Sequence, residues 1–237
     1  MHLAILRVHK DEQSYNRHWQ SQERLDLTGI TGLFKTDLEG QIVHKARNEV
    51  VEMALSSPDW DVALMVDDDM MLHPGTIQQA RARMEARPDI HILTGVYFEK
   101  RFPHTPQLYD LALEEVFKNK YWPVIDYRER ADSEGMVEVD ACGAGILFVR
   151  RGVFEAVRRP WFQFLDRMGE DFYFCRKAKT AGYKIWCDVN MQALHVGVIE
   201  IGEYIFAQVR PMLKRVLPPE GDTGVSVEGY EMAGGNA

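Results

Sequence analysis

Three consecutive carboxylates, Asp67, Asp68 and Asp69, follow directly after an apolar run in this sequence. Adjacent anionic groups repel one another, so their pKa values rise unless a cation compensates the charge. A divalent metal ion is such a cation, because Mg²⁺ and Mn²⁺ prefer carboxylate oxygens. The other interpretation is a solvated acidic turn that caps the helix expected to begin near Pro74.

Two more groups have side chains suited to metal binding or proton transfer. Glu170 and Asp171 lie at the start of an expected helix, and His195 follows an apolar stretch that we expect to be a strand. Taken singly, the acidic pair fits a favourable interaction with the helix dipole, and a lone histidine fits a structural role. Together with the aspartate run, their order along the chain favours one functional site.

Composition limits the class of protein. The chain has 237 residues, 46% of them hydrophobic, which is enough for the core of one α/β domain. Its formal net charge of -8 gives no overall basic surface for nucleic acid. Cys142, Cys175 and Cys187 are widely spaced in apolar surroundings, which favours reduced core thiols. No segment approaches the about 20 apolar residues of a membrane span, and we expect a cytoplasmic protein.

The elements that must position these residues alternate between strand and helix, which is typical of an α/β fold. The run at 62–66 has the pattern of a strand buried on both faces, and the aspartates follow its carboxyl end, where open α/β sheets bind ligands. We expect strands at residues 2–8, 62–66, 89–98, 136–142, 146–150 and 183–189, an edge strand within 121–130, and helices near 15–28, 41–57, 74–87, 151–157 and 169–182.

The C-terminal part has two expected segments. Residues 199–217 have helical spacing interrupted by Pro211, which fits either a lid over a bound ligand or a packed terminal helix. Residues 218–237 are rich in glycine, and we expect a flexible tail.

The ordered motifs resemble nucleotide-sugar glycosyltransferases of the GT-A fold, closest to the family 2-like inverting enzymes. The resemblance runs from the first strand to about residue 197 and includes "KARNEVVEMAL", "VDDDMMLHPGTI", "GAGILFVRRGVFEAV" and "GEDFYFCRKAKTAGYKIW". "VDDD" is similar to the DxD motif of that family. A histidine about two dozen residues beyond the last motif's helix start matches a further metal ligand of such enzymes, here His195.

The resemblance implies a role for each donor-side residue. Asp69 and His195 would hold Mn²⁺ or Mg²⁺ together with the donor diphosphate. Asp67 or Asp68 would reach the ribose hydroxyls of the donor nucleotide. Arg47 would face its base or phosphates, and Gly95 is grouped with these donor-binding residues.

The resemblance also implies roles for residues on the acceptor side. Asp171 would be the general base that takes the proton of an acceptor hydroxyl, and Glu170 would hold an acceptor hydroxyl or support the loop. Gly143, Ala144 and Gly145 would allow close approach of the sugars. Trp161 would present an aromatic face to a ring, although a place in the core fits it equally well.

The implied protein is a single GT-A, Rossmann-like domain at residues 1–217, with a mostly parallel central sheet flanked by helices. It would transfer a sugar from a nucleoside-diphosphate sugar to an acceptor hydroxyl, with metal dependence and inversion. The acceptor stays open: a glycan, a small molecule or a hydroxymethylated nucleic-acid base. For the last, arginines near 150–159 and basic residues near 210–215 offer contacts.

Two functions of other kinds stay open beside this one. A noncatalytic module that binds nucleotide-sugars or glycans would keep the metal site without turnover. A phosphatase of the haloacid dehalogenase type also has a strand ending in Asp-x-Asp. Its nucleophile motif continues with Thr or Val, however, where this chain has Met71.

Overall fold

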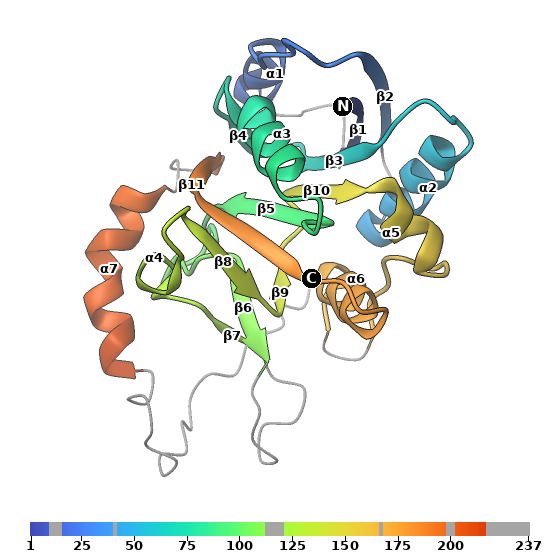
Figure 1. Ribbon diagram of the computed structural model, residues 1–237. Helices are drawn as coiled ribbons and strands as arrows, with labels where there is room; N and C mark the ends of the chain where they lie inside the picture. Colours follow the sequence, from blue (N-terminus) through green and yellow to red (C-terminus); the bar gives the residue numbers. More distant parts are fainter. Residues whose placement is uncertain (10–15, 40–41, 112–120, 166–167, 198–201, 217–237) are drawn as a thin grey trace.

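The computed structural model describes residues 1–9, 16–39, 42–111, 121–165, 168–197 and 202–216. Its centre is an eight-stranded sheet with the order β2-β1-β3-β10-β5-β11-β4, in which β8 also pairs with β11 (Figure 1). These strands are β1 (His2–His9), β2 (Gly32–Glu39), β3 (Val62–Asp67), β4 (Met70–Leu72), β5 (Ile92–Val96), β8 (Met136–Val139), β10 (Ile146–Arg150) and β11 (Ile185–His195). A smaller sheet has the order β7-β6-β9, formed by β6 (Leu108–Leu111), β7 (Tyr121–Pro123) and β9 (Ala141–Cys142).

Helices connect and cover these strands. They are α1 (Asn16–Glu23), α2 (Val43–Leu55), α3 (Thr76–Ala86), α4 (Tyr127–Arg130), α5 (Arg151–Ala156), α6 (Glu170–Thr180) and α7 (Glu203–Val216). Figure 1 shows α3 apart from α2, α5 and α6 across the large sheet. None of the helices in the described ranges is long and apolar enough to cross a membrane.

Most strands of the large sheet share one direction. β1 pairs in parallel with β2 and β3, and β5 pairs in parallel with β11. β10 is antiparallel to both β3 and β5, so β5 has the same direction as β3. β4 and β8 run against β11. The expected α/β fold with a mostly parallel central sheet is therefore confirmed.

The core lies on both faces of this sheet. The first five residues of β3 are all buried, as expected for a strand between two others with both faces covered. Ala63 and Met65 pack in one apolar cluster with residues of α2, α5 and α6, and Val62, Leu64 and Val66 pack in a second cluster with residues of α3. This alternation follows the two-residue period of a strand.

Several expectations from sequence are confirmed in the elements around β3. α2 ends at Leu55, and Ser56 to Pro58 follow it. Gly182, with a φ of 91°, follows the C-cap of α6 in the left-handed region that glycine adopts without strain. The expected edge strand within 121–130 is β7. All three cysteines are free and buried.

Other expectations differ from the structure. The acidic run does not cap α3, whose N-cap residue is Gly75, because the short strand β4 separates the aspartates from the helix. β2 is not among the expected strands, since it is an edge strand whose sequence, GLFKTDLE, mixes charged and apolar residues without a buried apolar run. β11 extends to His195, so this histidine ends the strand rather than following it. The expected tail at 218–237 lies outside the described residues.

Candidate active site

The site residues meet at one edge of the large sheet. The parallel strands β3, β5 and β11 end there with Asp67, Val96 and His195. β10 runs against β3 and β5, so the loop that precedes it, Gly143 to Gly145, reaches the same edge. Residues that are far apart in the sequence are therefore neighbours because of strand direction.

Arg47 of α2 is the centre of a buried ion network. Its Nη2 donates to both carboxylate oxygens of Asp67, at 2.7 and 2.9 Å, and its Nη1 donates to Oε1 of Glu170. Its guanidinium also lies over the ring of Phe162, 5.8 Å from the centroid. Both terminal nitrogens of the Arg47 guanidinium bind carboxylates, and its expected contact with the donor base or phosphates stays a prediction.

The single guanidinium charge of Arg47 compensates part of the negative charge of the two carboxylates. Burial lowers the pKa of Arg47, but the carboxylates of Asp67 and Glu170 raise it by more, so the guanidinium stays charged. Burial raises the pKa of Asp67, and Arg47 opposes that rise. Glu170 of α6 is paired with Arg47 of α2, and its expected role on the acceptor side stays a prediction.

Asp69, two residues further on, has different surroundings. Lys100 Nζ lies 2.5 Å from Oδ2 of Asp69, and His195 Nε2 lies 3.4 Å from Oδ1. Oδ1 is buried and has no hydrogen-bond partner in the part of the chain that the structure describes. One oxygen of this carboxylate is thus paired, and the other is turned towards a ring nitrogen.

The tautomer of His195 explains why that contact is unsatisfied. Nδ1 lies 2.8 Å from the backbone carbonyl of Phe98, which can only accept, so Nδ1 carries the proton. In the neutral ring Nε2 then presents a lone pair to Asp69, and two acceptors face each other. A cation between them would satisfy both, so Asp69 and His195 fit a metal ion.

The charge state of Asp69 fits the same use. Burial raises the pKa of Asp69, but His195 in its protonated form and Lys100 outweigh burial and lower this pKa to about 2, which keeps the carboxylate ionised near neutral pH. Within the described ranges, no group of three or more His, Cys, Asp or Glu side chains is placed to hold a metal ion. Asp69 and His195 therefore fit a metal that takes further ligands from a bound molecule and water.

Asp171 is the candidate base. It lies in the first turn of α6, where its Oδ1 accepts from the backbone N–H of Phe172 at 2.8 Å. Burial, followed by the negative charge of Glu170, raises its pKa to about 7, although Arg47 lowers it. A carboxyl with a pKa near the working pH is suited to accept a proton. The charges of Arg47 and Glu170 thus also change the pKa of Asp171.

Tyr97 joins the glycine loop to the other site residues, and the sequence analysis did not single it out. The backbone N–H of Gly145 donates to its hydroxyl at 3.0 Å, and its ring packs edge-on against His195 with centroids 5.6 Å apart. A Cβ on Gly143 would lie only 2.0 Å from the Tyr97 hydroxyl oxygen. The glycines are therefore needed here to admit Tyr97, while Ala144 between them is buried.

The structure also gives the surroundings of three other expected site residues, Gly95, Trp161 and Asp68. Gly95 lies inside β5, where a Cβ would lie 2.5 Å from the carbonyl oxygen of Met191, so close strand packing accounts for it. Trp161 is buried and its indole N–H donates to the carbonyl of Phe154, which places it in the core. Asp68 is partly exposed in the turn between β3 and β4.

The segment from Tyr97 to Lys100 is the main feature that sequence reasoning missed. Tyr97 contacts the glycine loop, Phe98 orients His195, and Lys100 binds Asp69. A signal was present, because the segment directly follows the carboxyl end of a predicted buried strand. Its residue types alone do not distinguish these contacts from core packing.

The arginines considered for binding a polyanion have protein partners. Arg150 donates to the carbonyls of Ile90 and Met84, and Arg151 to the carboxylate of Glu155. Arg159 pairs with Glu52. Arg151 and Arg159 are therefore paired with carboxylates, whereas Arg150 meets only carbonyl oxygens, which carry no compensating charge.

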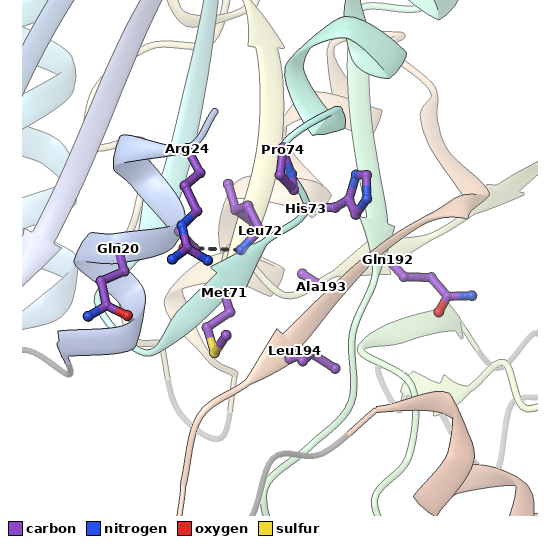
Figure 2. Close-up of a pocket in the computed structure, with 10 residues that line it drawn as sticks. Gln20, Arg24, Met71, Leu72, His73, Pro74, Gln192, Ala193 and Leu194 are labelled. Carbon is purple, nitrogen blue, oxygen red and sulfur yellow. Dashed lines mark hydrogen bonds between the residues drawn. The ribbon is translucent and has the colours of Figure 1, made fainter. Parts of the chain in front are cut away.

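A pocket of about 350 Å³ lies where α1 and the turn after it meet β4 and β11 (Figure 2). Met71 and Leu72 of β4 line it beside their strand partners Leu194 and Ala193 of β11, and Gln20 and Arg24 line it from the side of α1. Its lining includes neither an acidic side chain nor His195. We therefore place the candidate active site at the carboxylate edge and not in this pocket.

By its fold, this structure is an α/β protein that is similar to proteins with a GT-A-like fold. No family model and no curated protein matches the chain. The solved structure of A197 from STIV is similar over 83% of this chain and 86% of that one, with a TM-score of 0.58 and 19% identity.

GalNAc-T7, solved with UDP, GalNAc and Mn²⁺, is similar with a TM-score of 0.55 and 12% identity. The similarity covers 84% of this chain but only 43% of GalNAc-T7, so this chain corresponds to less than half of that protein. At these identities the two comparisons establish the fold alone.

Proposed function

We propose that this protein is a metal-dependent glycosyltransferase that moves a sugar from a nucleoside-diphosphate sugar to an acceptor hydroxyl with inversion. The observation that carries the proposal is the unpartnered Oδ1 of Asp69 facing Nε2 of His195. This pair shares a sheet edge with a carboxyl, Asp171, whose pKa is raised to about 7. We assign the transferase domain to residues 1–217.

Asp69 and His195 are the residues that would hold Mn²⁺ or Mg²⁺. When bound, such an ion neutralises charge that develops on the leaving nucleoside diphosphate. Phe98 keeps His195 in the tautomer that turns the Nε2 lone pair towards Asp69. UDP is the first nucleotide to test, since GalNAc-T7 was solved with UDP and Mn²⁺.

We assign different roles to the members of the acidic run. Both oxygens of Asp67 accept from Arg47, and we take Asp68 as the candidate for the ribose hydroxyls because of its place in the turn after β3. Asp68 is partly exposed in the turn that follows β3, at the edge where the donor would lie. Asp67 instead fixes the end of β3 relative to α2 and α6.

Asp171 would act as the general base in a single displacement. Its carboxylate takes the proton of the acceptor hydroxyl while the oxygen forms a bond to the anomeric carbon. The bond from that carbon to the diphosphate oxygen breaks, and the nucleoside diphosphate leaves with the electron pair. Attack from the face opposite the leaving group inverts the anomeric centre. The Gly143 to Gly145 loop would lie on the acceptor side.

Donor hydrolysis tests the proposal. UDP-, GDP-, ADP- and dTDP-sugars are incubated with the protein in Mn²⁺ or in EDTA, and release of nucleoside diphosphate is measured. We expect slow release from one donor class that needs Mn²⁺. A noncatalytic binding module would release none, and a phosphatase would hydrolyse simple phosphate esters faster than any nucleotide-sugar.

The acceptor class is tested next with the donor so identified. Transfer is compared among oligosaccharides, small alcohols and DNA containing hydroxymethylated bases. Because Arg150, Arg151 and Arg159 have protein partners, we expect DNA to be the weakest of these acceptors. Transfer to modified DNA at the highest rate would overturn that order.

A further inference from the structure

Lys100 binds the same carboxylate as the proposed metal but on its other oxygen. Its Nζ lies 2.5 Å from Oδ2 of Asp69, while Oδ1 faces His195. The Lys100 and Asp69 side chains are 33% and 22% exposed, so solvent and ligands reach both groups. An ammonium group is therefore positioned beside the candidate metal site.

The loop around Lys100 is held by backbone hydrogen bonds. Glu99 N–H donates to the carbonyl of Thr105, and Gln107 N–H donates to the carbonyl of Tyr97, each at 2.9 Å. Phe98 and Pro106 form a β-bridge between these two contacts. The backbone at Lys100 is thus fixed near the end of β5, with its ammonium on the carboxylate of Asp69.

We propose that Lys100 binds the diphosphate of the donor and stabilises it as the leaving group. This inference rests on the proposed function and assigns a further residue to the same site. A metal ion on Asp69 and the Lys100 ammonium carry like charges, so they repel each other across one carboxylate. An anionic diphosphate that ligates the metal would lie beside both cations and compensate them.

Lysine suits this role because its ammonium is a compact charge with three donors on a flexible stem. It can stay near Asp69 while directing a hydrogen bond to a phosphate oxygen. Positive groups that face the charge developing on a leaving phosphate accelerate its departure. The competing explanation is that Lys100 only neutralises Asp69 and supports the fold.

Titration calorimetry on three proteins separates these explanations: the parent, Lys100→Met and Arg101→Met. Arg101 is the adjacent, exposed cation of the same loop and serves as the charge-matched control. Each protein is titrated with Mn²⁺ alone, and then with UDP, GDP, ADP and inorganic pyrophosphate in saturating Mn²⁺. Melting temperatures are measured in parallel.

We expect Lys100→Met to weaken diphosphate binding about tenfold, the usual effect of losing one charge-assisted hydrogen bond, while Mn²⁺ binding alone stays equal or becomes tighter. Arg101→Met should change diphosphate binding by less than about twofold. Equal diphosphate affinity in Lys100→Met and parent, or loss of Mn²⁺ binding in Lys100→Met, would overturn the inference while the proposed function stands. A parent that binds none of these diphosphates would overturn both.

Discussion

Asp67 and Asp69 are two residues apart, yet they belong to two regions with opposite character. Asp67 accepts two hydrogen bonds from the buried Arg47, which also binds Glu170. Asp69 has one oxygen on the partly exposed Lys100 and the other facing a histidine nitrogen that cannot donate in its neutral form. We refer to these regions as the closed network and the open cluster.

The difference shows how one acidic turn serves structure and ligand binding together. In the closed network every charge has a protein partner, so removing one partner leaves a buried charge uncompensated. In the open cluster the buried Oδ1 of Asp69 has no hydrogen-bond partner among the described residues, which costs stability. The position in front of this oxygen is left for a ligand. Asp171 lies beside the closed network, because its pKa responds to Glu170 and Arg47.

Breaking the closed network should give the largest effect. Replacing Arg47 with Met leaves the buried Glu170 and the partly exposed Asp67 without their cation, and we expect a loss of about 3–5 kcal/mol in the free energy of unfolding. Arg159→Met is the control, because its pair with Glu52 is about half exposed on both sides, and it should cost about 0–1 kcal/mol. Urea unfolding of both variants measures the difference; equal losses would contradict the distinction between the pairs.

Replacing the candidate base, Asp171, should give the next largest effect. Asp171→Asn keeps the shape of the side chain but cannot take a proton, so transfer should fall by about 10²-fold or more with donor affinity nearly unchanged. Single-turnover transfer and donor titration measure these two quantities. Transfer at the parent rate would rule out the inverting mechanism proposed for Asp171. Glu170→Gln is not a neutral control, since it also weakens the pairing of Arg47.

The pH dependence of transfer follows from the same residue. The base must be deprotonated, and its pKa is raised to about 7, so the rate should rise with pH up to about 7 and then level off. One pH unit below the pKa, about a tenth of the molecules are competent. Single-turnover rates from pH 5 to 9 test this; a plateau that extends down to pH 5 would mean that another group is the base.

Replacing Asp69 and Asp67 one at a time with asparagine sharpens the comparison between the open cluster and the closed network. Asp69→Asn should weaken Mn²⁺ binding about tenfold or more and change stability by less than about 1 kcal/mol. Asp67→Asn should do the reverse, with a stability loss of about 1–3 kcal/mol and Mn²⁺ affinity close to the parent. Electron paramagnetic resonance of free Mn²⁺ and urea unfolding provide both readouts. The same pattern in both variants would mean that the acidic run acts as one unit.

The smallest expected effect reaches the open cluster through α7. Phe206 stacks on Phe98, with ring centroids 4.8 Å apart, and the carbonyl of Phe98 orients His195. Phe206→Leu should therefore weaken Mn²⁺ binding several-fold, about the lower end of outer-shell effects. Tyr204→Ala, on the same helix but 77% exposed, should leave Mn²⁺ affinity unchanged. Equal Mn²⁺ affinity in Phe206→Leu and parent would show that α7 does not influence the site.

That contact bears on the two interpretations of residues 199–217. In its described part, α7 is packed: Phe206 is buried, and Glu203 binds Arg128 and Gln192. This agrees with a packed terminal helix. Closure of this segment over a donor stays a prediction, which hydrogen exchange with and without UDP and Mn²⁺ would test.

The sequence by itself determined the α/β class and most elements, because these depend on local patterns. The apolar run at 62–66 predicted a buried strand, and the small residues before 146 predicted a loop. The short β4 could not be predicted, since its backbone pairs with β11 and is covered by His18 and Ser21 of α1, all distant in sequence.

Which carboxylate does what was decided only by the tertiary structure. In the sequence, Asp67, Asp68 and Asp69 are equivalent members of one run, and Arg47 is a candidate for binding the donor. The direction of β3 and its distance from α2 and α6 bring Arg47 to Asp67, and the ends of β5 and β11 bring Lys100 and His195 to Asp69. Local propensity does not encode such contacts, because a charge takes its role from the partners that folding places around it.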